Sequence, residues 1–188
     1  MDYSLEKREL FLMQQVYAAL VSLAGKIENQ ANGYFKGLTA RQYMAILAAF
    51  HLPQEETTIK NIAHKLGTTK QNADRLIFAV KKKGYITVSG CESDKRAVNI
   101  QMTSSGLRAM TENSESGIYF MADVFNDFSE KELKTLWNLL KKLHAFDGEG
   151  YSGFEEDASH RFKVRGDHSR RQARMLEIFR KKRRNIRR

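Results

Sequence analysis

The chain has 188 residues, 41% of them apolar, and carries a formal net charge of +10 at pH 7. This length supports one hydrophobic core with an appendage, and the single Pro suits a mostly helical protein. One cysteine excludes an internal disulfide framework and fits a reducing cytoplasm. The sequence has no uninterrupted run of 18 apolar residues that would predict a membrane span, and its first ten residues lack the pattern of a secretory signal.

The positive charge is concentrated at the C-terminal end. Residues 161–188 hold 13 Lys and Arg against two acids, whereas the other 160 residues hold 19 basic and 20 acidic groups. The charge of this tail therefore does not by itself make the folded part a nucleic-acid binder. Within that near-neutral part, residues 57–96 carry nine Lys and Arg against three acids, which predicts a local basic patch.

Apolar residues at a period close to 3.6 predict six helices, bounded by Gly, Pro or a hydroxyl residue that can cap a helix. They run from about Ser4 to Gln30, from Thr39 to the break at Pro53, from Thr57 or Thr58 to Gly67, from Thr68 or Thr69 to Gly84, from Thr103 or Ser104 through Phe125, and from the capping box at Ser129 through Leu143.

Two short strands are predicted between the fourth and fifth helices, from Gly84 to Thr103. Tight hairpins favour Asn-Gly or Asp-Gly at their tips, but this hairpin has a long polar tip that ends in Asp94-Lys95-Arg96. Ordering such a tip costs conformational entropy without burying apolar surface, which indicates that the tip touches something. The expected fold class is mainly α with a small β-hairpin wing.

The third and fourth helices, joined at Gly67, have the pattern of a helix-turn-helix, in which the start of the second helix enters the major groove of DNA. Gln and Asn pair with adenine and Arg with guanine, whereas Lys and hydroxyl groups at a helix N-terminus suit phosphate. The candidate DNA-binding residues on this helix are Thr69, Lys70, Gln71, Asn72, Asp74 and Arg75.

A charged helix face is usually only solvated, and this alternative applies to an isolated helix. The hairpin that follows at once favours a winged helix instead. Its Lys95 and Arg96 are then placed to reach the flanking minor groove or the backbone, and Asp94 holds Arg96 in position.

The sequence resembles the MarR-type transcriptional regulators over roughly residues 5–146, in the runs GLTARQYMAILAAF, IKNIAHKLGTTKQNADRLIFAVKKKGYI, SDKRAVNIQMTSSG and FSEKELKTLWNLLKKL. The wing motif, residues 94–97, is the most specific part. The resemblance implies that Asp94 and Arg96 form the wing pair and that the exposed side chains of the fourth helix are the recognition positions. Asp74 and Phe78 stand where the family has hydroxyl and polar residues, so no base preference is carried over.

The resemblance also implies a homodimer in which the first helix and the last two helices of each chain interlock. A long first helix and an apolar stripe on the sixth helix exceed what a small winged helix needs to cover itself, although an intramolecular helix pair is the alternative. A dimer predicts two half-sites one helical turn apart and hence a near-palindromic operator. The interface residues expected on the sixth helix are Leu133, Leu136, Leu140 and Leu143.

The expected organisation is a body over residues 1–146, a linker over 147–160 and a basic tail over 161–188 that is either disordered or a short helix. In the body, the winged helix covers about 38–103, and the dimerisation helices cover about 4–31 and 104–146. Three roles stay open for the tail. It adds non-specific phosphate contacts, which is the favoured role, it forms an amphipathic helix for a membrane surface or an acidic partner, or it is a solvated end.

No phosphate loop, nucleophile elbow or paired-carboxylate motif is present, and the five histidines lack metal-ligand spacing, so no catalysis, metal or cofactor is expected. Cys91 has acidic neighbours, which does not favour a redox switch. The sequence predicts a cytoplasmic, homodimeric regulator that binds double-stranded DNA, more in keeping with a repressor, with any small-molecule effector unknown. The alternative is a winged-helix interaction module whose basic tail recruits an acidic partner or surface.

Overall fold

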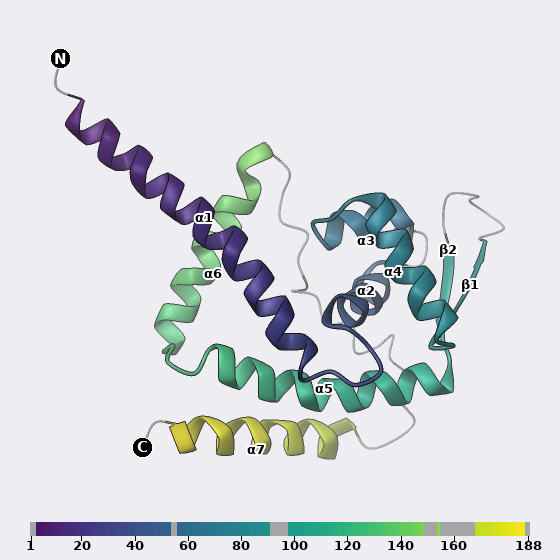
Figure 1. Cartoon of the computed structure of the whole chain (residues 1–188). Helices are drawn as coiled ribbons and strands as arrows, with labels where there is room; N and C mark the ends of the chain where they lie inside the picture. The colour runs from purple at the N-terminus through teal and green to yellow at the C-terminus, as the bar shows by residue number, and fades with distance from the viewer. Residues whose placement is uncertain (1–2, 54–55, 91–97, 149–153, 155–167, 187–188) are drawn as a thin grey trace.

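The computed structural model describes residues 3–53, 56–90, 98–148, 154 and 168–186, and it confirms a mainly α fold with one antiparallel hairpin (Figure 1). The predicted helices and hairpin are all present, and a further helix lies near the C-terminus. In chain order the elements are α1 (Ser4–Asn32), α2 (Ala40–His51), α3 (Ile59–Lys65), α4 (Lys70–Lys82), β1 (Ile86–Gly90), β2 (Val98–Met102), α5 (Ser104–Val124), α6 (Glu130–His144), the short 3-10 helix η2 (Ala145–Asp147) and α7 (His168–Ile186).

Hydroxyl side chains set the starts of five helices. Thr39 and Ser129 form capping boxes with Gln42 and Glu132, in which each side chain pairs with the other residue's backbone amide. The three further caps, each accepting a backbone N–H one turn into its helix, are Thr58, Thr69 and Thr103. The sequence left a choice of neighbouring residues at each of these three starts, and the cap geometry resolves it.

The main core lies inside the winged helix, where α2, α3, α4 and the base of the hairpin meet. Ile46, Ile62 and Val80 are fully buried there, and Ile86 of β1 joins the same cluster. Met110 of α5 belongs to the same core cluster, and Figure 1 shows α5 running beneath the winged helix. The helix α4 and the hairpin are therefore held on one packed core.

Asn113 of α5 joins the body to the loop that follows α1. Its side chain is 1% exposed, yet all its polar atoms are paired: Oδ1 accepts from the Lys36 N–H (2.8 Å), and Nδ2 donates to the carbonyl oxygens of Lys36 (2.9 Å) and Ala109 (2.8 Å). A buried amide with every partner satisfied specifies one position for the chain. The loop from α1 into α2 is thus tied to α5.

The long helix α1 projects away from the rest of the molecule in Figure 1. Ala31 is its one buried residue, and large apolar side chains stay exposed along its first two thirds, including Phe11, Met13 and Tyr17. Within the part of the chain that the structure describes, α1 is also the helix whose length and composition would allow it to cross a membrane, a criterion that core helices and signal sequences meet as well.

Candidate nucleic-acid interface

The helix α4 follows α3 after a sharp corner at Gly67. This residue has φ = 58°, in the left-handed region that favours glycine, and the next residue, Thr68, donates its N–H to the Ala63 carbonyl (2.9 Å). The turn therefore closes tightly enough for Ala63 and Ala73, two small buried residues, to bring α3 and α4 together. This is the helix-turn-helix corner that the sequence predicted.

The two faces of α4 differ as the periodicity indicates. Ala73, Ile77 and Val80 are buried in the core. The outward side chains are exposed, and they are Lys70, Gln71, Asp74, Arg75 and Phe78. Phe78 is 65% exposed, so the aromatic ring that departs from the family pattern lies on the same open face.

Thr69 and Asn72 are engaged in local hydrogen bonds at the start of α4. The Thr69 hydroxyl accepts the Asn72 N–H (3.2 Å), and the Asn72 side chain donates to the Thr68 hydroxyl (2.8 Å). Asn72 is half-buried, unlike Gln71 and Arg75. In this conformation its amide stabilises the corner, which leaves Gln71 and Arg75 as the side chains with amide and guanidinium groups free to reach bases.

The hairpin is antiparallel, with Ile86 opposite Met102 and Val88 opposite Ile100. Ile86 and Ile100 are buried, whereas Thr87 and Gln101 on the other face are exposed, so the strands alternate between core and solvent. This alternation fixes the direction in which the wing leaves the core. The wing residues Asp94, Lys95 and Arg96, and Cys91 beside them, lie outside the described residues.

The base of the wing is bonded to both α4 and α5. Gly84, with φ = 72°, ends α4, and its carbonyl accepts the hydroxyls of Thr103 (2.6 Å) and Ser105 (2.9 Å). The next carbonyl, of Tyr85, accepts the Thr103 N–H (3.1 Å) and lies where a side chain on Gly106 would have to be. The angle between α4 and the hairpin is therefore set by hydrogen bonds to the Gly84 and Tyr85 carbonyls.

Lys83, just after α4, has a structural role that the sequence analysis did not predict. The Lys83 ammonium donates to the Gln42 side-chain oxygen (2.7 Å) and to the Gly37 carbonyl (2.9 Å). That Gln42 oxygen also accepts the Thr39 N–H (3.1 Å). Gln42 and Lys83 both fall in the runs that resemble the MarR-type regulators, and here they join the end of α4 to the start of α2.

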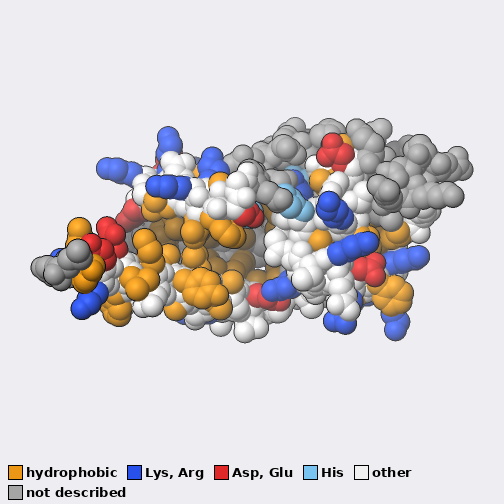
Figure 2. All heavy atoms as spheres, turned by 90° about the horizontal axis from the view of Figure 1, so that it is seen from above, with side chains coloured by type: hydrophobic (Ala, Val, Ile, Leu, Met, Phe, Trp, Pro, Cys, Tyr) orange, Lys and Arg blue, Asp and Glu red, His pale blue; other side chains and the backbone are white. Residues whose placement is uncertain are grey.

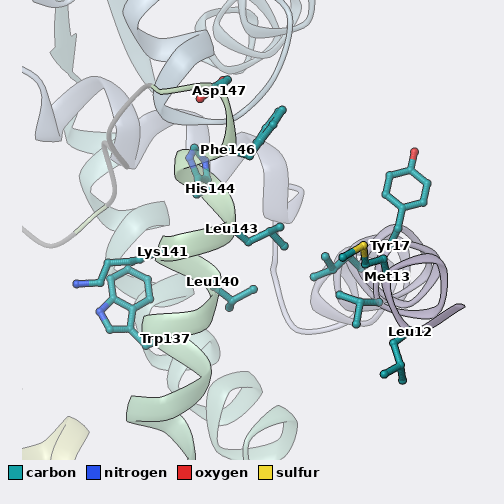
Figure 3. Close-up of a pocket in the computed structure, with 12 residues that line it drawn as sticks. Leu12, Met13, Tyr17, Trp137, Leu140, Lys141, Leu143, His144, Phe146 and Asp147 are labelled. Carbon is teal, nitrogen blue, oxygen red and sulfur yellow. The ribbon is translucent and has the colours of Figure 1, made fainter. Parts of the chain in front are cut away.

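A second candidate surface is an apolar groove of about 910 Å³ between the first half of α1 and the end of α6. Figure 2 shows hydrophobic side chains gathered around this hollow, and in Figure 3 Leu140 and Leu143 of α6 point towards α1. The main apolar residues around it are Leu12, Met13, Val16, Tyr17, Leu20, Trp137, Leu140, Leu143 and Phe146.

The groove contains part of the stripe expected for dimerisation. Leu140 and Leu143 line it, whereas Leu133 is half-buried and Leu136 lies at a separate hollow with Leu139. Trp137 and Phe146 also line the groove, and Phe146 is 84% exposed. The sequence analysis did not include these two residues in the expected interface. The helical period of the apolar stripe on α6 would have included Trp137. Phe146 could not be predicted from that period, because it lies beyond the end of α6.

No cluster of three or more His, Cys, Asp or Glu in the described part of the chain could hold a metal ion. The aromatic rings near the end of α1 pack within the protein: Phe35 stacks on Tyr43 (5.0 Å between centroids) and Tyr34 meets Phe120 (5.3 Å). Burial raises the pKa of the Tyr43 phenol, which keeps this ring neutral.

Comparisons with known proteins agree with this geometry. No family model matches the chain. A curated relative, the HTH-type transcriptional repressor YetL of Bacillus subtilis (strain 168), is 19% identical over 138 residues, which are 70% of this chain and 83% of that protein. A MarR/EmrR family transcriptional regulator from Acinetobacter sp. ADP1 superposes with a TM-score of 0.63 at 24% identity, covering 73% of this chain and 97% of that one.

The S. aureus MepR–DNA complex superposes with a TM-score of 0.60 at 18% identity, covering 69% of this chain and 96% of that protein. The predicted resemblance is thus confirmed at the level of the fold: this chain has the fold of the MarR-family regulators. Both structures are covered over nearly their full length, whereas between a quarter and a third of this chain is unmatched.

Proposed function

We propose that this chain is a sequence-specific DNA-binding transcriptional regulator, acting as a homodimeric repressor on a near-palindromic operator. The observation that carries the proposal is the open polar face of α4, held at a fixed angle to the base of a wing by hydrogen bonds to the Gly84 and Tyr85 carbonyls. MepR, which has the same fold, was solved with DNA, and YetL is described as a repressor.

In this proposal α4 lies in the major groove of the duplex. Gln71 and Arg75 contact base edges, Gln pairing with adenine and Arg with guanine. Thr69 and Lys70, at the N-terminus of α4, contact phosphate, since the helix dipole and the free N–H groups there favour anions. Asn72 keeps the corner in place and reaches DNA only if it leaves the Thr68 hydroxyl.

The wing supplies the second contact of each half-site. Lys95 and Arg96 reach the minor groove or the backbone beside the α4 site, and Asp94 orients Arg96. A narrow A·T-rich minor groove attracts an inserted Arg by its deeper negative potential. Because β1 and β2 emerge from the same core as α4, one half-site is read by two elements whose relative position is fixed.

The apolar groove between α1 and α6 is the proposed dimer interface, and Leu140 and Leu143 are among the residues that line it. The proposed organisation keeps a winged helix at about 38–103, dimerisation helices at about 4–31 and 104–146, a linker at 147–160 and a tail at 161–188. The regulator works in the cytoplasm without a catalytic reaction, and its effector, if it has one, is unassigned.

The experiment is selection of binding sites from a random duplex library with the full-length chain, followed by titration of the enriched site. Replacing Arg75 by Ala removes a bidentate base contact, worth about 1–3 kcal/mol, so affinity falls by about 5- to 150-fold and preference relaxes at one position per half-site. Arg96→Ala tests the wing in the same way. Lys131→Gln on the outer face of α6 is the control. If no motif is enriched, the proposal fails.

An exposed acid on α4 favours a second candidate. Asp74 lies on the open face beside Gln71 and Arg75, where it repels phosphate. In this candidate the winged helix is a protein-interaction module and the basic tail recruits an acidic partner. Asp74→Asn distinguishes the two, because it strengthens binding to all duplexes if the face meets DNA and leaves binding unchanged if it does not.

A further inference from the structure

The helix α7 lies beyond residues 5–146, the part of the sequence that resembles the MarR-type regulators, and it docks on α5 through a shared carboxylate. The Lys182 ammonium contacts Asp123 Oδ2 (2.9 Å), the same oxygen that accepts the Tyr34 hydroxyl (2.7 Å). The ammonium also lies over the Tyr119 ring, 5.5 Å from its centroid. The bond from Tyr34 and, after it, the ammonium of Lys182 lower the pKa of Asp123, so the carboxylate stays charged.

A second cation of α7 extends the docking contact towards the loop before α6. Arg183 donates to the Phe128 carbonyl (2.5 Å), and its guanidinium lies 5.8 Å from the centroid of the Phe179 ring. Met175 and Ile178 are half-buried on the same side. The inward side of α7 thus uses two cations and its apolar residues to hold one fixed position along α5.

The opposite side of α7 is basic and open to solvent. Arg174, Arg180 and Lys181 are exposed, and Glu177, the acid among them, pairs with Lys181 (2.7 Å). Residues 168–186 contain six Arg and two Lys against this one acid. With a rise of about 1.5 Å per residue, the three exposed cations extend over about 10 Å of the helix. This outward side, with its three cations, is named the basic face of α7.

The basic face of α7 cannot extend the interface of α4. In Figure 1 α7 runs along one side of α5, while α3, α4, β1 and β2 lie on the other side. A duplex against α4 is therefore separated from α7 by the thickness of the body. The sequence analysis favoured extra phosphate contacts from the tail, and this placement directs such contacts to a different DNA segment.

We propose that the basic face of α7 is a second phosphate-binding surface, which holds another segment of duplex DNA while α4 and the wing hold the operator. The inference rests on the proposed function for the first duplex only. Arginine, which predominates here, suits phosphate oxygens because its planar fork donates two parallel hydrogen bonds. A bilayer is a poorer match, since Met175 and Ile178 are half-buried and, among the described side chains of α7, Leu176 and Phe179 are the two large apolar ones left exposed.

The test is a two-duplex capture assay with the full-length chain. An immobilised duplex carrying the selected site binds the protein, and a labelled duplex without that site is then added at rising salt. The test variant is Arg174→Gln/Arg180→Gln/Lys181→Gln. The matched control, Lys131→Gln/Lys134→Gln/Lys142→Gln, removes the same charge from exposed positions on α6. Circular dichroism establishes that both variants fold.

The inference predicts that the test variant loses at least about tenfold in capture of the second duplex, and that the salt slope of this step flattens by about 2.7, or 0.9 per lost phosphate contact. Binding of the first duplex stays within about twofold, and the control captures the second duplex like the unaltered chain. Equal capture by both variants overturns the inference. A parallel loss of first-duplex binding also overturns it, because α7 then belongs to the operator interface.

A third variant separates this inference from the proposed function. In Gln71→Ala/Arg75→Ala the α4 face is disabled while α7 is untouched. Residual, salt-sensitive binding of any duplex by this variant, abolished when the α7 substitutions are added, supports the inference even if no operator motif exists. If the residual binding instead goes to a poly-glutamate peptide and not to DNA, the basic face serves an acidic protein and the inference is wrong.

Discussion

Replacing Gly106 by Ala is expected to destabilise the protein, although it puts a better helix former into α5. A Cβ at this position would lie 1.9 Å from the Tyr85 carbonyl oxygen and 2.8 Å from its carbonyl carbon. Those atoms belong to the backbone between α4 and the wing, and the oxygen already accepts the Thr103 N–H (3.1 Å). The obstacle therefore cannot turn aside as a side chain would.

Two terms decide the sign of the effect. Alanine favours a helix over glycine by about 1 kcal/mol. Inserting a methyl group into a packed site costs about 1–3 kcal/mol, and the upper end or more applies here because the backbone has to move. The net loss is about 2 kcal/mol or more, which lowers the melting temperature of a chain of this size by about 4–8 °C.

Thermal unfolding followed by circular dichroism measures this effect, with Gly117→Ala as the control in the same helix. A Cβ on Gly117 would meet nothing within 4 Å, so this variant keeps the propensity gain of about 0.5–1 kcal/mol and melts slightly higher. If Gly106→Ala also melts higher, the close approach of α5 to the base of the wing is wrong. Because the same contact orients the wing, we further expect weaker operator binding at temperatures where the variant is still folded.

Three further predictions concern contacts away from the wing. Asn113→Asp replaces the buried amide by a carboxylate, which cannot donate the two hydrogen bonds to the Lys36 and Ala109 carbonyls. The free energy of unfolding should fall by about 2–3 kcal/mol in a urea titration at pH 7, and an unchanged midpoint would contradict the buried pairing. Asp123→Asn removes the charge that holds Lys182, so trypsin cleaves α7 faster while the melting temperature of the body changes little. The folded pKa of Asp123 lies below its ordinary value of 3.8, so the contribution of this carboxylate to stability is present above about that pH and is lost as the pH falls through the lowered pKa. Protection of the α7 amides against hydrogen exchange should fall in the same pH range. Leu140→Glu places a charge in the apolar groove and should shift the protein to monomer in analytical ultracentrifugation, an outcome that Lys142→Glu on the opposite side of α6 should not give.

Much of the fold could be predicted because local chemistry determines it. Hydroxyl caps, the glycine corner at Gly67 and the period of the apolar residues each act within a few positions, so the helices and the hairpin follow from the sequence. The capping box of Ser129 and Glu132 is an example in which both partners lie one turn apart.

The contacts that join distant segments could not be predicted in this way. The hydrogen bonds from Asn113 to Lys36 and from Lys83 to Gln42 connect residues 77 and 41 positions apart, and nothing local marks their partners. The tail shows the same limit. Its charge predicted a phosphate contact, but the position of α7 on the far side of α5 depends on Asp123 and on the Phe128 carbonyl, which lie far from it in the sequence.

The exposed apolar surface of α1 and α6 is best explained by a second copy of the chain. A membrane would cover α1 alone. The helix α1 also carries the polar residues Gln14 and Gln15, and its C-terminal end is held to α2 by the ion pair between Glu28 and Arg41 (2.7 Å). A copy of α1 or α6 in the groove covers both helices in one contact. Since apolar burial contributes about 25 cal/mol per Å², a surface of this extent favours association. In the proposed homodimer this contact would place two α4 helices on one assembly, as a palindromic operator requires.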